Sequence, residues 1–137
     1  MSEFEPMLRE LLSAGHTARF RAAGDSMYPA IRGGDYLYIV PSVVSELRRG
    51  DVVLAATDRG LTAHRIVCIR GRDGSLRITT RGDNSLRNDR PVGAADILGR
   101  VARVDGATTV RKPGLESAPI LRFAAVLVRR LRGALQQ

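Results

Sequence analysis

The sequence is poor in the residues that build disulfide frameworks, metal centres and base-stacking surfaces. Its 137 residues include one cysteine, two histidines, no tryptophan and only 4% aromatic side chains. The single cysteine, Cys68, excludes an intramolecular disulfide, and two histidines with one cysteine cannot complete the common four-ligand zinc sites. The shortage of aromatic rings argues against a surface that stacks nucleic-acid bases. We therefore expect no metal and no cofactor.

Long apolar runs are also missing. The longest run, residues 123–128, is far shorter than the roughly 20 apolar residues that a membrane-spanning helix needs. Residues 1–10 contain three glutamates and no apolar stretch, which excludes a secretory signal peptide there. These absences predict a cytoplasmic protein.

Lysine is almost absent, although the chain is basic. The formal net charge is +8, and 22 − 1 = 21 of the basic residues are arginines because Lys112 is the only lysine. Residues 1–60 carry 7 − 8 = −1 and residues 61–137 carry 15 − 6 = +9. A basic half is suited to an acidic peptide, an anionic membrane surface or a nucleic acid. Nucleic acid is the least expected of these partners, because no recognition motif accompanies the charge.

Periodicity and turn residues predict one mainly β domain over residues 1–112. Apolar residues at helical spacing predict a short helix over residues 3–14, which Gly15 is placed to end. Short β-branched and aromatic segments, separated by turns about every 10 residues, then predict a small folded β-sheet barrel. Cys68 is expected to be buried in one of its strands. The expected strands are 17–23, 35–40, 52–57, 61–70, 75–80, 97–104 and 108–111, with a long loop over 81–95.

Residues 113–137 are expected to form a linker and a basic amphipathic helix over 119–135. One interpretation packs its apolar face on the barrel or on a second copy of the chain, which would give a homodimer. The other lays its arginines on an anionic membrane, which would hold the protein weakly at the inner membrane face. The first is favoured, because the helix is short and its polar and apolar residues are poorly segregated.

Ser26 and His64 are the residues best suited to nucleophilic chemistry. Ser26 lies between a predicted strand and a turn, where its hydroxyl can be exposed and the backbone N–H groups of Asp25 and Ser26 can bind an oxyanion. A serine hydroxyl needs a base to remove its proton. Lys112 lies beside Pro113-Gly114 in the expected linker, so His64, inside a predicted strand, is the better base.

A histidine base also needs a carboxylate that orients it and stabilises its charged form. Asp83 and Asp89 lie in the long loop that follows the strands, and either is within reach of His64. The spacing alone leaves both open.

Five blocks of sequence in one order resemble the superfamily of type I signal peptidases and LexA-like peptidases. Any one block is a weak signal, whereas five in order with ordinary spacing over residues 20–104 are specific. The blocks are Gly24-Asp25-Ser26-Met27-Tyr28-Pro29, Arg49-Gly50-Asp51, His64-Arg65-Ile66-Val67, Gly82-Asp83-Asn84 with Asp89-Arg90, and Ile97-Leu98-Gly99-Arg100-Val101.

The resemblance implies a serine endopeptidase that cleaves a specific protein or peptide precursor. Bacterial members use a serine and a lysine, but archaeal and endoplasmic-reticulum signal peptidases have histidine where this chain has His64. By that match Ser26 is the nucleophile, His64 the base and Asp89 the acid, with Asp83 as the alternative acid. Met27 and Pro29 are expected beside the substrate cleft, where a peptide adds as an extended strand with small side chains at the cut.

The chain also departs from these relatives. Gly24 stands where many signal peptidases have a serine that assists the oxyanion, and neither the membrane anchor nor the helix-turn-helix domain is recognisable. A catalytically degenerate peptide-binding or regulatory module of the same fold is therefore the alternative function. Self-cleavage at Ala14-Gly15 is disfavoured, because about 11 residues at roughly 3.3 Å each must also build a strand before Ser26.

Overall fold

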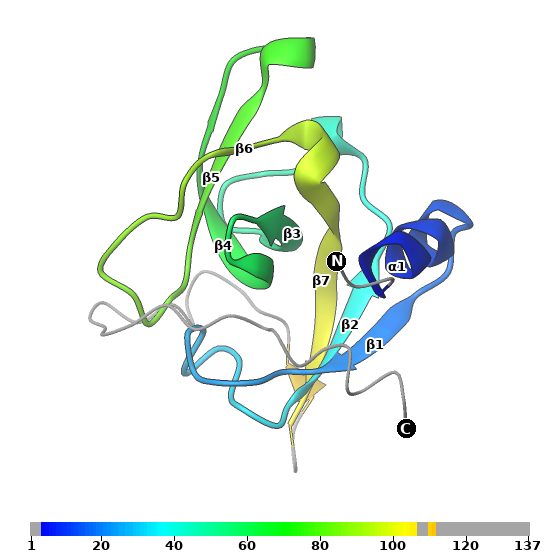
Figure 1. The fold of residues 1–137 in the computed structure, drawn as a ribbon. Helices are drawn as coiled ribbons and strands as arrows, with labels where there is room; N and C mark the ends of the chain where they lie inside the picture. The colour runs from blue at the N-terminus through cyan, green and yellow to red at the C-terminus, as the bar shows by residue number, and fades with distance from the viewer. Residues whose placement is uncertain (1–3, 107–109, 112–137) are drawn as a thin grey trace.

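The computed structural model describes residues 4–106 and 110–111 as one helix, eight strands and three short 3-10 helices (Figure 1). The 3-10 helices are Val44–Glu46, Asp73–Ser75 and Ala94–Asp96. The helix and strands are α1 (Phe4–Ser13), β1 (Ala18–Arg21), β2 (Tyr36–Val40), β3 (Val52–Thr57), β4 (Gly60–Arg70), β5 (Arg77–Arg81), β6 (Val92–Gly93), β7 (Ile97–Asp105) and β8 (Val110–Arg111).

Helix α1 forms because its apolar residues recur on one face. Phe4, Leu8 and Leu12 are buried, and the Phe4 ring meets Phe20 of β1 edge to face with centroids 5.6 Å apart. Gly15, which the sequence placed as the helix stop, has a φ of 87° that favours glycine. The helix therefore covers one part of the sheet, and the expected helix over 3–14 is confirmed.

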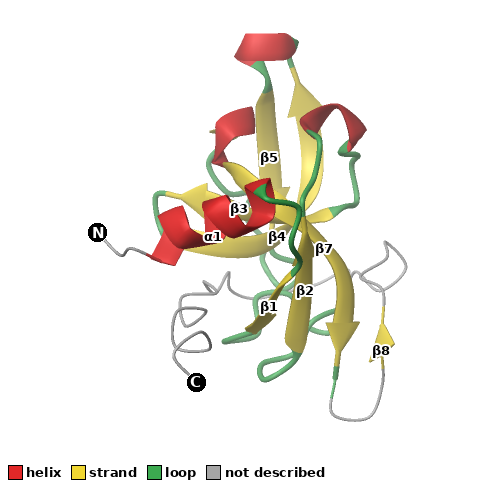
Figure 2. Ribbon diagram, turned by 90° about the vertical axis from the view of Figure 1, so that its right-hand side faces the viewer, coloured by secondary structure: helices red, strands yellow, loops and turns green. Residues whose placement is uncertain are grey.

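All strands belong to one antiparallel sheet in the order β1-β2-β7-β3-β4-β5-β6, with β8 beside β7 (Figure 2). The mainly β class is confirmed, but the expectation of a closed barrel is wrong. Strands β1 and β6 end the sheet and lie far apart in Figure 1. They do not pair with each other, so the sheet stays folded and open.

Strand β3 lies between two hydrophobic cores. Val52 and Leu54 point into the core beneath α1, whereas Val53 and Ala55 point into a second core with Ile66 and other residues. Alternate residues of a strand face opposite sides of the sheet, so a strand buried on both sides reads as an unbroken apolar run. The second core is built by Leu47, Val53, Ala55, Ile66, Ile78, Val92 and Ile97.

Several local expectations need correction. The predicted loop over 81–95 contains β6 and the 3-10 helix Ala94–Asp96, and the turn at residues 72–74 runs into another 3-10 helix. Cys68 is half-buried, not buried, because a bulge between Ile66 and Cys68 interrupts the alternation of β4. None of the described helices is long and apolar enough to span a membrane. The linker and helix expected over 113–137 lie outside the described residues.

Candidate active site

Ser26 stands in the turn that follows β1. Gly24, two residues earlier, has a φ of 78°, a backbone conformation that favours glycine and turns the chain after β1. The Ser26 side chain is 3% exposed, so the hydroxyl lies below the molecular surface. Its position is fixed at the carbonyl as well, because the Ser26 C=O accepts a 2.7 Å hydrogen bond from the Asn84 N–H.

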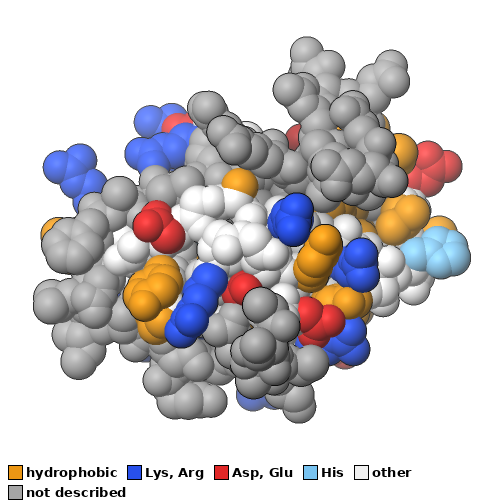
Figure 3. Space-filling view, turned by 90° about the horizontal axis from the view of Figure 1, so that it is seen from below, with side chains coloured by type: hydrophobic (Ala, Val, Ile, Leu, Met, Phe, Trp, Pro, Cys, Tyr) orange, Lys and Arg blue, Asp and Glu red, His pale blue; other side chains and the backbone are white. Residues whose placement is uncertain are grey.

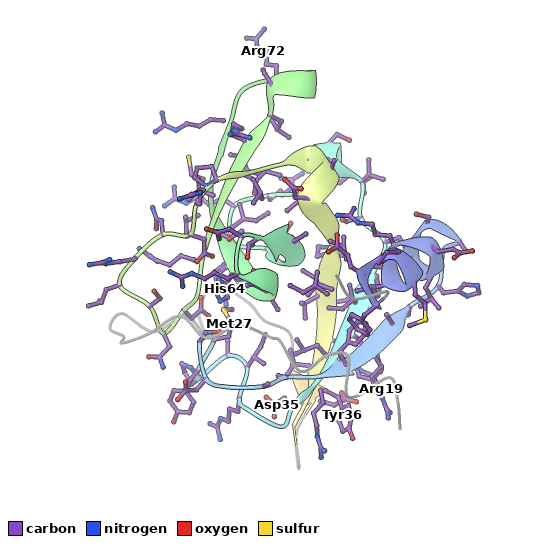
Figure 4. The ribbon with its side chains drawn as sticks, viewed as in Figure 1. Arg19, Met27, Asp35, Tyr36, His64 and Arg72 are labelled. Atoms are coloured by element: carbon purple, nitrogen blue, oxygen red, sulfur yellow. The ribbon has the colours of Figure 1, made fainter. Side chains whose placement is uncertain are left out.

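His64 lies near the middle of β4, opposite Val53 of β3, and is 1% exposed. Its Nε2 atom is 3.2 Å from the Ser26 Oγ, and its Nδ1 atom is 2.6 Å from the Asp89 Oδ2. An ionised carboxylate can only accept hydrogen bonds, so Nδ1 carries the hydrogen and Nε2 is free to accept the serine proton. Figure 4 shows His64 directed toward the turn that carries Met27, the residue after Ser26.

Asp89 is held by β5 as well as by His64. Its Oδ2 accepts a second hydrogen bond from the Thr80 hydroxyl at 2.7 Å, and its N–H donates to the Thr80 carbonyl at 2.8 Å. Burial alone would raise the pKa of the Asp89 carboxyl. The hydrogen bond and charge of His64, the hydrogen bond from Thr80 and the charge of Arg59 outweigh burial and lower that pKa below its ordinary value. Asp89 is therefore an anion beside the imidazole.

Asp83, the alternative acid, pairs with Arg65 instead of His64. Arg65 donates from Nε to Asp83 Oδ1 at 2.8 Å and from its terminal nitrogen to Oδ2 at 2.7 Å. The two side chains are 4% and 3% exposed, so this is a buried bidentate ion pair. Arg65 also donates to the Gly50 carbonyl at 2.9 Å. The pair fixes the loop after β5 to β4 on the face of the strand opposite His64.

The start of that loop packs against the serine and the imidazole. A Cβ atom on Gly82 would lie 2.7 Å from the Ser26 carbonyl oxygen and 3.2 Å from the His64 Nε2, so only glycine fits there. The next residues bind the serine turn, because the Asp83 N–H contacts the Met27 sulfur at 3.3 Å and the Asn84 side chain donates to the Asp25 carbonyl at 3.0 Å. The loop therefore sets the spacing between Ser26 and His64.

Two backbone N–H groups beside the serine are unoccupied. Within residues 4–106 and 110–111, the N–H groups of Asp25 and Ser26 donate no hydrogen bond. Backbone donors next to a nucleophile can bind the negative oxygen of a tetrahedral intermediate. The sequence analysis predicts that these two backbone donors, and not a side chain at Gly24, bind the oxyanion.

A small apolar cavity adjoins Ser26. The centre of a water-sized sphere can move within about 10 Å³ there, so the cavity has room for about one water molecule. Met27 lines this cavity, but Pro29, the other residue expected beside the cleft, does not and is half-buried. The lining residues are Ala22, Ala23, Gly24, Ser26, Met27, Ile31, Leu37 and Ala63.

The sequence and the structure differ in what they bring to the site. The structure places His64 between Ser26 and Asp89, and Asp83 beside Arg65. The sequence analysis missed Thr80, the Arg65–Asp83 pair, and the contacts of Gly82 and Asn84 with the serine turn. Alternation along β4 could have signalled the ion pair, since it sets Arg65 on the face opposite His64.

Comparison with known proteins gives one result. The family model described as Peptidase S24-like matches residues 2–102. This range includes the helix, β1 to β6 and the hydrogen-bonded residues Ser26, His64 and Asp89. A search of curated proteins finds no match.

Proposed function

This chain belongs to the Peptidase S24-like family, and we propose that it is a serine endopeptidase that cleaves a specific protein or peptide precursor. The observation that carries the proposal is the continuous row from the Ser26 Oγ through both nitrogens of His64 to the Asp89 Oδ2, with distances of 3.2 and 2.6 Å. A nucleophile, a base and an orienting acid in this order form the arrangement that activates a hydroxyl for acyl transfer.

In the proposed reaction, the Ser26 Oγ attacks the carbonyl carbon of a peptide bond while the His64 Nε2 takes the hydroxyl proton. The carbonyl oxygen becomes an anion that the N–H groups of Asp25 and Ser26 bind. The protonated imidazole, stabilised by Asp89, then gives its proton to the leaving amine, and an acyl-serine remains. Water attacks this ester by the same path, with His64 again acting as base, and releases the product.

The cavity beside Ser26 favours a small side chain next to the cut. A cavity with room for about one water-sized group, surrounded by alanine, leucine, isoleucine and methionine side chains, admits a group near the size of a methyl. The resemblance to signal peptidases implies the same preference. The expected substrate therefore has alanine or a residue of similar size at the cleavage site, presented in an extended strand.

The alternative is a peptide-binding module that has lost catalysis. Its sign would be a separation of Ser26 from His64 beyond hydrogen-bond reach, and the separation is 3.2 Å. No described contact favours this alternative over hydrolysis.

A biotinylated fluorophosphonate tests the proposal without a known substrate. The reagent phosphonylates an activated serine, so we expect the wild-type chain to be labelled at Ser26 and Ser26→Ala to stay unlabelled. Ser45→Ala is the matched control, because Ser45 is exposed in the 3-10 helix Val44–Glu46 and should leave labelling unchanged. A wild-type chain that resists the reagent, or is labelled at another serine by peptide mapping, contradicts the proposal.

A further inference from the structure

The edge strand β1 offers unpaired backbone groups close to the serine turn. In the register of β1 with β2, Ala22 exchanges hydrogen bonds with the segment before β2, at 2.7 and 2.9 Å. Hydrogen-bonded and non-hydrogen-bonded positions alternate along an antiparallel pair, so Phe20 also bonds to β2. The N–H and C=O groups of Arg19 and Arg21 therefore point away from β2, toward the side of β1 on which no described strand lies.

The two faces of β1 differ sharply. Its burial alternates, with Ala18 and Phe20 buried and Arg19 and Arg21 exposed. A peptide strand that pairs with this edge must alternate in the same way, since its side chains line up with those of β1 on both faces. One set would turn to the buried face, where Ala22 borders the cavity beside Ser26, and the other set would turn to the arginines.

Arg19 and Arg21 are held in place but lack an acidic partner. Their guanidinium carbons lie 4.4 and 5.4 Å from the ring centre of Tyr36, so stacking fixes them on the outer face (Figure 4). In the described part of the chain, no carboxylate lies within ion-pair distance of either one. Figure 3 shows the molecule from below, where basic side chains lie among hydrophobic and acidic ones.

We propose that Arg19 and Arg21 select an extended peptide with acidic side chains at alternate positions, next to the segment that enters the active site. Residues two apart in a strand are separated by roughly 6.6 Å, so two carboxylates of one peptide strand match two arginines of the neighbouring strand. This inference rests on the proposed function, because it assigns the charge of the substrate. Small side chains then face the cavity, and acidic side chains face the arginines.

The test measures binding and not cleavage, so that it is independent of the chemistry. The Ser26→Ala chain is titrated, by fluorescence anisotropy, into labelled peptides of repeated Ala-X-Val-X sequence in which X is Glu, Gln or Lys. Two exposed ion pairs predict a dissociation constant for the Glu peptide about three- to tenfold below that of the Gln peptide. The preference should shrink when salt is raised from about 0.05 to about 0.5 M.

Charge reversal gives the decisive variant. Adding Arg19→Glu and Arg21→Glu should abolish the preference for the Glu peptide and favour the Lys peptide by a similar factor. The matched control is Arg72→Glu with Arg77→Glu, which changes the net charge equally at the end of the molecule far from His64 (Figure 4). The control should keep the preference for Glu.

Three results would overturn the inference: no measurable binding of the Glu peptide, equal affinity for the Glu and Gln peptides, or a preference that survives reversal of both arginines. Failure of the proposed function shows separately, as a wild-type chain that the fluorophosphonate does not label. If the wild-type chain is labelled but binds the three peptides equally, the proposed peptidase function stands and only the inference about an acidic substrate fails.

Discussion

Two carboxylates of one loop meet two adjacent residues of one strand, and the pairs differ in what they can do. Asp89 binds His64 through a single oxygen at 2.6 Å, whereas Asp83 binds Arg65 through both oxygens at 2.8 and 2.7 Å. An imidazole exchanges its proton near neutral pH, and a guanidinium in a protein does not. The imidazole pair can therefore move a proton, while the guanidinium pair can only hold structure.

The difference follows from the geometry of a strand. Residues 64 and 65 face opposite sides of β4, so no single carboxylate can serve both. The loop after β5 carries both acids, and Asp89 binds the residue on one face while Asp83 binds the residue on the other. One loop with two acidic residues can therefore combine a group suited to proton transfer with a structural ion pair. Substitutions that damage one pair and spare the other test this division.

The largest expected effect is the loss of the base. His64→Gln keeps a polar side chain of similar reach but cannot relay a proton to a leaving amine, so the rate of peptide hydrolysis should fall by about 10²–10⁴-fold. The melting temperature should change little. His16→Gln is the control, because His16 is exposed after α1. Measured kcat/KM values within a factor of about two of wild type would contradict the assigned role.

Breaking the guanidinium pair should act on folding instead. Asp83→Asn leaves the buried Arg65 charge without its carboxylate, which predicts a free energy of unfolding lower by about 3–5 kcal/mol in urea denaturation. Asp58→Asn serves as the control, because its 3.9 Å contact with Arg90 is exposed and such pairs contribute about 0–1 kcal/mol. If Asp83→Asn unfolds at the same urea concentration as wild type, the Arg65–Asp83 ion pair does not stabilise the fold.

A smaller effect is expected at Thr80, which touches only the acid of the imidazole pair. Thr80→Val removes the hydroxyl that bonds Asp89 and should lower kcat roughly tenfold, close to the lower end of about 1.5–3 kcal/mol for a hydrogen bond to a charge. KM should stay near wild type. Thr80→Ser should restore the rate, and Thr79→Val, one residue away in β5, should leave it unchanged. A rate in Thr80→Ser as low as in Thr80→Val would indicate a packing role only.

Thr80 also shows where prediction from the sequence stops. In an unbroken hairpin, the pairing of Cys68 with Thr79 would set Ile66 opposite Arg81. The bulge between Ile66 and Cys68 shifts the register by one residue, so that Ile66 pairs with Thr80. Nothing in the composition of β4 marks this extra residue. The alternation of side chains and the positions of the turns therefore do not predict the hydrogen bond from Thr80 to Asp89.

The local elements were easier to predict, because their causes are local. The apolar stripe and Gly15 define α1, and β-branched runs between glycine turns define β2 and β3. Closure of the sheet is a property of all strands together, and no local pattern in the sequence measures how far β1 lies from β6. The choice between Asp83 and Asp89 likewise depends on the path of the loop, which the spacing of the two residues does not determine.

The smallest expected effect is the pH dependence of the stability that Asp89 contributes. The pKa of Asp89 lies below its ordinary value, despite burial, because His64 and Thr80 stabilise the anion. A carboxyl whose pKa is lower in the folded than in the unfolded chain contributes its full stabilisation at pH values above its pKa in the unfolded chain, which is about 3.9 for aspartate. That contribution disappears as the pH falls through the folded value. Asp89→Asn lacks it at every pH.

The gap in unfolding free energy between wild type and Asp89→Asn should therefore be widest above about pH 4 and should narrow in more acidic solution. Urea denaturation at a series of pH values measures the gap. A gap that stays constant down to the acid limit would mean that Asp89 is not held as an anion by its neighbours. The stabilised anion is what lets Asp89 support a charged imidazole, so a constant gap would also remove the electrostatic reason for preferring the imidazole pair as the proton-moving one.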